Sequence, residues 1–305
     1  MTPVVHVAGI RKSYGSTVAV DDVSFDVQDG EIFGLIGPNG AGKTTTMECV
    51  EGLRRPDRGS ISVLGLDPIR DVYALQRRVG IQLQEAQLQK RINVREAVHL
   101  WAALYRKPAS DGDRLLEQLG LVEKRGAWFM TLSGGQKQRL FIVLALVNDP
   151  ELVFLDELTT GLDPQARHAI WDLVRGIRAR GKTVLLTTHL MEEAERLCDR
   201  VAIIEHGRVI DADTPERLVA RHCPERTVVV MTTDPLAGEH FGSIPRVQSV
   251  ERQESRFTIR GSGEDFVSAV IGCLFENRIA VTDFRTVHPS LEDVFLRLTG
   301  RSIRD

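Results

Sequence analysis

The feature that most constrains the fold of this chain is a glycine-rich loop, residues 37–44, between an apolar run and a candidate helix. The loop fits the pattern G-x-x-x-x-G-K-[ST], in which glycines let successive backbone N–H groups converge on a phosphate chain. Residues 31–36 are typical of a strand, and a helix can begin at Thr44. This order points amides and the positive end of a helix dipole at an anion, which predicts a nucleotide site. The residues expected to line that site are Gly37, Pro38, Asn39, Gly40, Ala41, Gly42, Lys43, Thr44 and Thr45.

Two pairs of side chains suggest the chemistry of the site. In this loop pattern Lys43 reaches the β- and γ-phosphates, and the Thr44 hydroxyl ligates Mg²⁺. A second apolar run, residues 152–155, ends in Asp156 and Glu157. A carboxylate at the carboxyl end of a parallel strand lies in the ligand crevice of such sheets. We therefore expect Asp156 in the Mg²⁺ shell, and Glu157 to polarise the water that attacks the γ-phosphate.

Composition limits the class of protein. The 305 residues allow one large or two unequal domains, and a net charge of −3 gives no electrostatic footprint for nucleic acid. The four cysteines are scattered without a C-x-x-C pair, so neither a zinc site nor a disulfide framework is indicated. The longest apolar run, residues 140–147, is far shorter than the roughly 20 residues that cross a bilayer. We expect a soluble, cytoplasmic protein that reaches a membrane only through a partner.

The order of candidate elements predicts a doubly wound α/β core. Residues 4–9 and 18–27 are typical of antiparallel strands, and residues 94–106 and 110–120 of amphipathic helices. A helix over residues 164–180 separates two buried strands of the parallel type, at 152–155 and 183–187. This alternation of strand and helix defines a first domain over residues 1–220, with a helical insertion at about residues 85–142.

The character of the chain changes after Leu218. Residues 221–226 form a plausible linker, and residues 227–305 a small accessory domain. There we expect strands at 227–232, 246–251, 255–260 and 279–286, and helices at 235–242, 264–277 and 290–299. The order βαββαβ followed by a helix predicts a ferredoxin-like module.

A second loop suited to anions precedes the apolar helix that starts near Leu140. Ser133 is a natural N-cap, and Gly134 and Gly135 leave the first amides of the helix bare. With Gln136 the segment Leu-Ser-Gly-Gly-Gln strongly resembles the signature of the ATP-binding cassette (ABC) family. The resemblance implies that this loop closes on the γ-phosphate of an ATP held by the opposite subunit of a head-to-tail homodimer.

The remaining motifs of that family follow in order, over roughly residues 4–220. Gln84 matches the Q-loop glutamine, which in the family contacts Mg²⁺ and senses the transmembrane partner; Gln82 is a competing assignment, and Leu83 stands where many members have proline. Asp163 matches the D-loop, which acts across the dimer, although Leu158 replaces a common proline.

Two further residues match family positions that touch the nucleotide. His189 matches the switch histidine, which touches the γ-phosphate and helps to hold the attacking water. Tyr14 matches the aromatic residue that stacks on adenine.

The end of the chain, residues 288–301, resembles the tail of daunorubicin-resistance-type drug-export ATPases. Together the resemblances imply the ATP-hydrolysing subunit of a bacterial ABC exporter for a hydrophobic drug or lipid-like compound, bound to a separate multi-span permease. The energising subunit of an importer is one alternative. A non-transport ABC ATPase is another, although this chain has one cassette, no sustained heptads and no basic patch.

Overall fold

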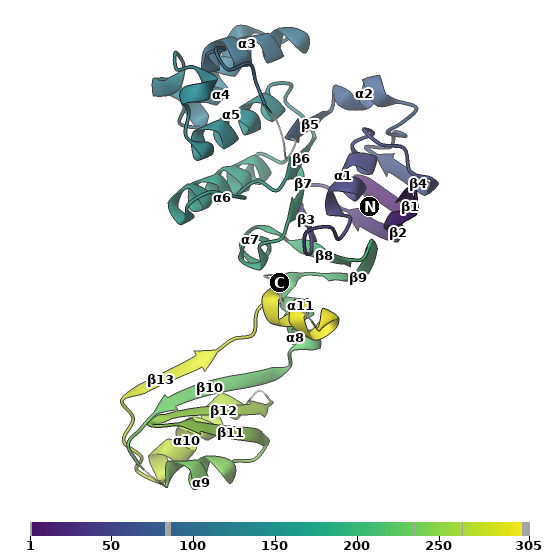
Figure 1. Cartoon of the computed structure of the whole chain (residues 1–305). Coiled ribbons are helices and arrows are strands. Elements are labelled where there is room, and N and C mark those ends of the chain that lie inside the picture. Colours follow the sequence, from purple (N-terminus) through teal and green to yellow (C-terminus); the bar gives the residue numbers. More distant parts are fainter. Residues whose placement is uncertain (1, 83–86, 235, 264, 301–305) are drawn as a thin grey trace. The chain divides into compact units, whose positions relative to one another are not determined.

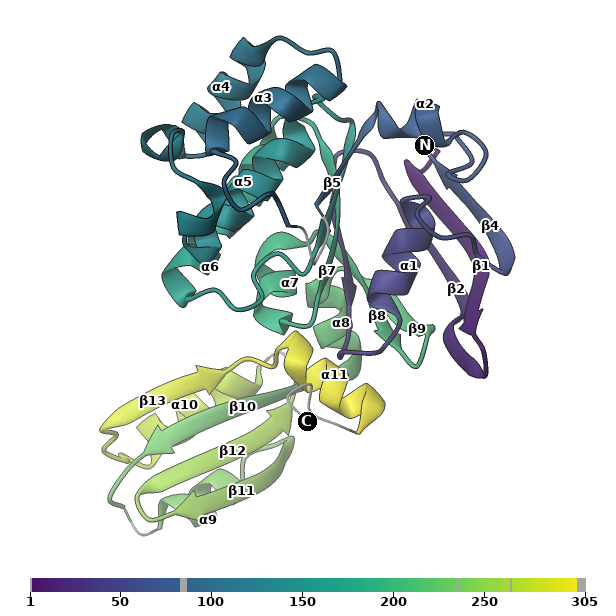
Figure 2. The same cartoon turned by 45° about the horizontal axis from the view of Figure 1, so that its top comes forward.

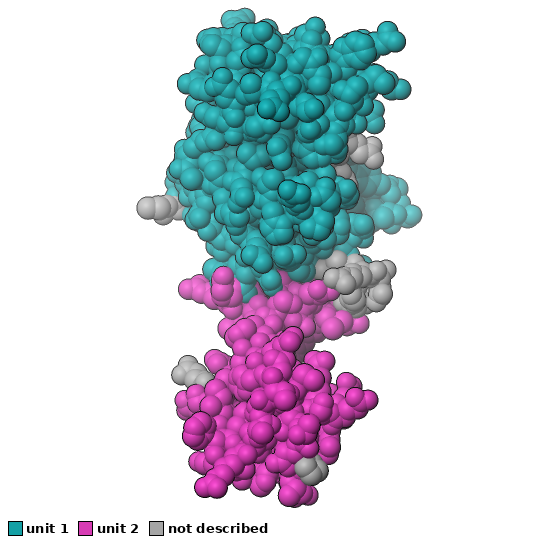
Figure 3. Space-filling view, turned by 90° about the vertical axis from the view of Figure 1, so that its left-hand side faces the viewer, with its two compact units in different colours: residues 1–215 teal, residues 216–305 magenta. Residues whose placement is uncertain are grey.

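The computed structural model describes residues 2–82, 87–234, 236–263 and 265–300, and the chain divides into two compact units (Figures 1 and 3). The units are Met1–Pro215 and Glu216–Asp305, so the division falls slightly before the expected domain end at residue 220. The prediction of a separate linker over residues 221–226 is wrong. Helix α8 (Pro215–His222) continues into its first two residues, and strand β10 begins at Glu225.

A small antiparallel sheet opens the first unit. Strands β1 (Val5–Tyr14), β2 (Thr17–Val27) and β4 (Arg58–Val63) pair in the order β2-β1-β4. The two N-terminal strands predicted from the sequence are confirmed as an antiparallel pair, with the first strand longer than expected. Tyr14 therefore ends β1, directly before the turn into β2.

The main sheet of this unit has six strands in the order β5-β6-β7-β3-β8-β9. All neighbours pair in parallel except β8 and β9, which are antiparallel. Every residue of β3, β6 and β7 is buried, because parallel strands covered on both faces need unbroken apolar runs. The strands are β3 (Ile32–Ile36), β5 (Val79–Gln82), β6 (Leu152–Asp156), β7 (Thr183–Thr188), β8 (Arg200–Glu205) and β9 (Arg208–Asp213).

Helices cover both faces of this sheet. Helix α1 (Lys43–Val50) lies between the two sheets and contacts β1, β2, β6 and β7 (Figure 2). Its Met47, Cys49 and Val50 belong to the core cluster formed with both sheets. Helices α6 (Pro164–Ala179) and α7 (Met191–Leu197) follow β6 and β7, and a short helix α2 (Val72–Gln76) precedes β5. The predicted doubly wound α/β architecture is confirmed.

The helical insertion is built from α3 (Val94–Leu104), α4 (Ala109–Gln118) and α5 (Gly134–Leu146), which contact one another. Two short 3₁₀ turns, Val122–Lys124 and Phe129–Thr131, lie between α4 and α5. The helices expected at 94–106 and 110–120 are confirmed with slightly earlier ends. Asn93 starts α3 with a capping box shared with Glu96, which explains the sharp boundary.

The second unit contains a four-stranded antiparallel sheet in the order β11-β12-β10-β13. The elements follow the predicted βαββαβ order, and buried side chains of α9 and α10 form a core with the sheet. The last helix, α11 (Leu291–Thr299), is tied to the start of β10 by two hydrogen bonds, of 2.9 and 3.0 Å, from Arg297 to the Glu225 carboxylate. The other elements are β10 (Glu225–Met231), α9 (Ala237–Gly242), β11 (Val247–Gln253), β12 (Arg256–Ser262), α10 (Phe266–Glu276) and β13 (Asp283–Val287).

Among the described residues, no helix combines the length and apolar character that a bilayer crossing requires.

Candidate nucleotide-binding site

Three neighbouring strands bring the predicted site residues to one edge of the main sheet. In the order β6-β7-β3, the carboxyl ends of these strands lead into Glu157, His189 and Gly37 respectively. Ligands of such sheets bind outside the carboxyl ends of the strands. Residues that are far apart in the sequence are therefore neighbours in the site.

The glycine-rich loop is closely approached by other backbone. Gly42 has a φ of 100° directly before α1, and a Cβ atom there would lie 2.3 Å from the carbonyl oxygen of Ala19. A Cβ atom on Gly37 would lie 2.1 Å from the carbonyl oxygen of Ile204. Both positions require glycine, because a side chain there would meet neighbouring backbone.

The Lys43 ammonium lies inside this loop. Its side chain is 3% exposed, and Nζ donates hydrogen bonds of 2.9 Å to the carbonyl oxygens of Gly37 and Pro38. Burial lowers the pKa of Lys43, and the negative charges of Glu157 and Asp156 oppose that shift. A buried cation at the start of a helix is suited to bind phosphate oxygens.

Asp156 ends β6 beneath the loop. Its carboxylate accepts a hydrogen bond from the Thr187 hydroxyl, and the Thr44 side chain lies close enough to affect its pKa. Burial raises the pKa of Asp156 and the Glu157 charge adds to the shift, while the Thr187 hydrogen bond, Lys43 and Thr44 oppose it. Mg²⁺ prefers hard oxygen ligands and is commonly held by one or two carboxylates together with phosphates. The adjacent Thr44 hydroxyl and Asp156 carboxylate fit that ion.

Glu157 is held in an unusual backbone conformation. Its φ of 47° is left-handed, and its N–H donates to the carbonyl oxygen of Thr187 at 3.2 Å and to the hydroxyl of the same residue at 3.1 Å. Thr160 Oγ1 donates to Glu157 Oε2 at 3.3 Å. His189 Nδ1 lies 3.6 Å from Glu157 Oε1, which is close but too long for a hydrogen bond. A strained backbone of this kind is found at functional sites, where neighbours hold it in place.

Lys43, Thr44 and Glu157 border a pocket of about 380 Å³, whose lining does not include Asp156 or His189. It is lined by Tyr14, Ala19, Asn39, Gly40, Gly42, Lys43, Thr44, Thr45 and Glu157. Tyr14 is 42% exposed, and the Arg54 guanidinium lies 5.4 Å from the centre of the Tyr14 ring. The structure thus brings Tyr14 to the predicted loop, as a stacking role requires. The sequence analysis did not predict Ala19 or Thr187. The only sequence signal for Thr187 is its position directly before Thr188-His189.

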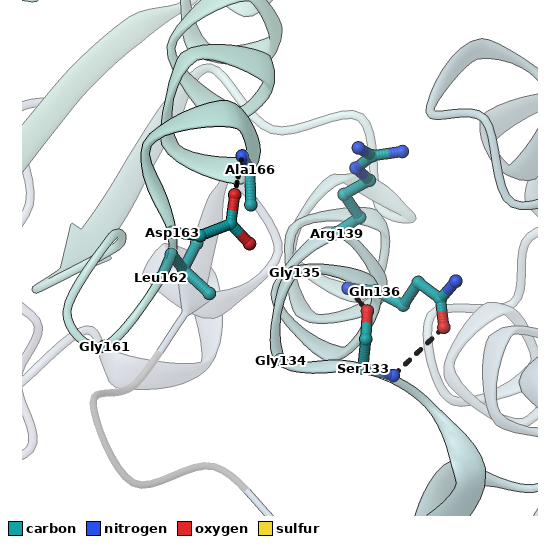
Figure 4. Close-up of a pocket in the computed structure, with 9 residues that line it drawn as sticks. All are labelled: Ser133, Gly134, Gly135, Gln136, Arg139, Gly161, Leu162, Asp163 and Ala166. Carbon is teal, nitrogen blue, oxygen red and sulfur yellow. Dashed lines mark hydrogen bonds between the residues drawn. The ribbon is translucent and has the colours of Figure 1, made fainter.

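The signature-like loop lines a different pocket, of about 230 Å³ (Figure 4). Ser133 caps α5 and exchanges hydrogen bonds with Gln136, while Asp163 caps α6 by accepting from the N–H of Ala166 at 2.9 Å. This pocket shares no lining residue with the Lys43 pocket. Its lining is Ser133, Gly134, Gly135, Gln136, Arg139, Gly161, Leu162, Asp163 and Ala166, of which Arg139 and Ala166 were not predicted.

The Q-loop prediction is only partly covered. Gln84 lies outside the described residues. Gln82, the competing assignment, is buried at the end of β5 and lines neither of the two pockets.

Comparisons with known proteins agree with this geometry. Residues 20–160 match the ABC transporter family. The chain is 40% identical to the Nod factor export ATP-binding protein I of Ralstonia nicotianae, over 100% of this chain and 96% of that protein. It is 42% identical to the protein of the same name from Paraburkholderia xenovorans, over 97% of each.

Solved structures show the same fold. One is an ATP-binding subunit of an ABC transporter, 32% identical, with a TM-score of 0.65 over 72% of this chain and 92% of that one. Another is the ADP conformation of an ATP-binding cassette, 25% identical, with a TM-score of 0.65 over 71% of this chain and 93% of that one. Because it is 40% identical over its whole length to the Ralstonia nicotianae protein, this chain belongs to the ABC transporter family, as an ATP-binding subunit.

Proposed function

We propose that this chain hydrolyses ATP in a head-to-tail homodimer and thereby drives export through a separate multi-span membrane permease. The observation that carries the proposal is the grouping of Lys43, Glu157 and His189 at the carboxyl ends of three adjacent strands. The predicted signature loop lies in another pocket, where it can serve a second nucleotide.

The geometry supports a separate role for each residue of the site. Phosphoryl transfer asks a protein mainly for positioning and charge stabilisation. Lys43 and the loop amides neutralise phosphate charge, Tyr14 stacks on the adenine, and Glu157 orients the attacking water with His189 beside it. Thr44 and Asp156, together with Gln84, would hold Mg²⁺, which supplies charge neutralisation when it is bound.

The two separate pockets support action across a dimer. The Lys43 pocket is lined by neither Ser133 nor Asp163 of the same chain. An isologous pair could place the exposed Ser133–Gln136 loop of each copy, with its Asp163, against the nucleotide of the other. The γ-phosphate of ATP would then stabilise the closed dimer, and loss of that phosphate would allow the dimer to open.

Export is supported by the names of the relatives. They are named for Nod factor export, and the aligned regions include the C-terminal unit as well as the cassette. We propose a hydrophobic drug or lipid-like compound as cargo; kinship with the daunorubicin-resistance type rests on the sequence of the tail, residues 288–301, and of the Q-loop segment, residues 81–84. The chain would be held at the inner face of the cell membrane by its permease.

The ATPase part of the proposal is tested with purified protein. Glu157→Gln removes the carboxylate while keeping its shape, so hydrolysis should stop and ATP should accumulate in a dimer visible by gel filtration. Wild-type protein should form that dimer only transiently. Full turnover by Glu157→Gln would overturn the assigned role.

Transport direction needs the membrane partner. The chain should be co-expressed with a multi-span protein encoded beside it, and inside-out vesicles should then accumulate a lipophilic fluorescent dye when ATP is added. Vesicles that carry Glu157→Gln are the control. A neighbouring secreted binding protein, with ATP-driven uptake in the opposite direction, would favour the importer instead.

A further inference from the structure

We propose that Glu193 is a positioning residue that couples the segment after Glu157 to the helix after His189. Glu193 lies in the first turn of α7 and is 1% exposed. Its Oε1 accepts a hydrogen bond of 2.8 Å from the Thr159 hydroxyl and one of 3.0 Å from the Trp171 indole N–H. One carboxylate oxygen thus joins three elements.

Each of these elements lies close in sequence to a residue of the proposed site. Thr159 is buried, lies two positions after Glu157, and precedes the turn that leads to Asp163. Trp171 is fully buried in α6, the helix that Asp163 caps. Glu193 itself lies four positions after His189. The contacts therefore link the D-loop, the helix behind it and the switch segment.

A carboxylate is an unusual choice for such a place. Burying an acid is costly unless its oxygens are hydrogen-bonded, and bonds to a charged acceptor are stronger and more directional than neutral ones. A buried polar group whose donors are all supplied by other segments specifies one arrangement of those segments. We infer that a displacement of α7 with His189 is passed to Thr159, and that Asp163 is thereby held where the second copy needs it.

This inference rests on the proposed dimer, in which Asp163 acts across the interface. It predicts that loosening Thr159 impairs closure of the dimer and leaves the nucleotide pocket of the single chain intact. A general loss of packing would instead weaken nucleotide binding and thermal stability as well.

The test uses ATP-driven dimerisation of the full chain in the Glu157→Gln background. Thr159→Val removes the donor hydroxyl while keeping the shape of the side chain. We expect the ATP concentration for half-maximal dimerisation to rise about tenfold, because Asp163 is then held less firmly in the arrangement that the closed pair needs. The dissociation constant for ADP, which reports the Lys43 pocket of the monomer, should change less than about twofold.

Three further variants separate positioning from stability. Glu193→Gln keeps an Oε1 acceptor for both donors but removes the charge that strengthens these bonds, so it should shift dimerisation in the same direction as Thr159→Val but by less. Trp171→Phe removes the second donor while keeping an aromatic ring, and should shift dimerisation in the same direction as Thr159→Val. Thr183→Val removes a buried hydroxyl at the opposite end of β7, one bonded to Gly30, and should leave dimerisation unchanged.

The outcomes distinguish the two proposals. A Glu157→Gln parent that stays monomeric at saturating ATP overturns the proposed function, and this inference with it. A parent that dimerises, with Thr159→Val and Trp171→Phe dimerising at the same ATP concentration, overturns the inference alone.

Discussion

The ammonium of Lys43 lies 3.9 Å from Oε1 of Glu157, and both side chains are more than nine-tenths buried. Each group compensates part of the other's charge in a site that is largely shielded from water. The predicted phosphate ligand and the predicted base are therefore one electrostatic unit. A change in either residue alters the surroundings of the other.

Replacing Lys43 with methionine keeps the stem of the side chain and removes its charge. Turnover of ATP should fall by about 10²-fold or more, the usual loss when one preorganised charge-stabilising group is removed. Steady-state phosphate release measures it. Lys124→Met, at an exposed position in a 3₁₀ turn, is the control and should keep normal turnover. If Lys43→Met hydrolyses ATP at a rate near that of the wild type, Lys43 is not the phosphate ligand.

A second acid near the site predicts a pH effect on stability. Glu51 follows α1 and is buried, and its Oε1 has no hydrogen-bond partner among the described residues. Burial, with the charges of Asp156 and Glu48, raises its pKa to about 8 from an ordinary value of 4.5. Between those values the folded chain keeps a proton that the unfolded chain has lost. The stabilisation present at acid pH is therefore lost progressively between about pH 4.5 and about pH 8, by at most about 1.4 kcal/mol per pH unit.

Glu51→Gln should remove this dependence because the amide does not ionise. Relative to wild type, the variant should gain melting temperature steadily between about pH 5 and about pH 8 in nucleotide-free buffer. Glu123→Gln, at an exposed position, should show no such trend. If the melting temperatures of Glu51→Gln and wild type differ by the same amount at every pH in this range, Glu51 is ionised in the folded chain.

Lys43 could be predicted from the sequence and Glu51 could not, because only Lys43 belongs to a recognisable local pattern. The glycine loop, the Asp156-Glu157 pair and the Ser133 cap are local patterns whose chemistry depends on a strand end or a helix start. They could be recognised before the strands were paired. The six-stranded order then brought the first two of them together with His189, as the alternation of strand and helix predicts.

Other contacts depend on pairing between distant segments. Thr187 meets Asp156 only through the register of β6 and β7, and Glu193 meets Thr159 and Trp171 only after α6 and α7 have packed. Neither residue carries a signature of its own. The boundary near 221–226 was missed for a related reason. Its polar composition is typical of a linker, yet Arg226 pairs with Gly261 in the sheet of the second unit.

The surroundings of Tyr14 predict an effect on nucleotide affinity. The Arg54 guanidinium lies 5.4 Å from the ring centre and is held by the Glu48 carboxylate, and Lys12 Nζ lies 5.8 Å from the same centre. A cation over an exposed aromatic ring contributes about 0.5–1 kcal/mol, which corresponds to roughly 2–5-fold in binding. Arg54→Met should raise the KM for ATP by that factor and leave kcat unchanged.

The matched control is the neighbouring exposed Arg55, for which no ring contact is found among the described residues. Arg55→Met should leave KM unchanged. Tripolyphosphate, which lacks the base, should inhibit Arg54→Met and wild type equally. A rise in its inhibition constant equal to the rise in KM would mean that Arg54 acts on the phosphates and not through Tyr14.

Ser133 allows the capping role of a side chain to be separated from its predicted role in trans. Its Oγ accepts a hydrogen bond of 3.3 Å from the N–H of Gln136, so Ser133→Ala should cost about 1 kcal/mol of stability through the lost cap. Ser133→Arg should in addition fill the space before the exposed amides of α5. It should retain ADP binding and lose hydrolysis, whereas Ser133→Ala should retain most of both.

Mixing two inactive variants tests the geometry directly. Ser133→Arg keeps an intact Lys43 pocket, and Lys43→Met keeps an intact signature loop. A head-to-tail pair of one copy of each contains one complete site, so an equimolar mixture should recover up to about a quarter of wild-type turnover if the copies pair at random. Ser133→Arg mixed with itself supplies the baseline. Because recovery requires the loop of one copy to reach the nucleotide of the other, a mixture no more active than that baseline would assign the loop to the nucleotide of its own chain.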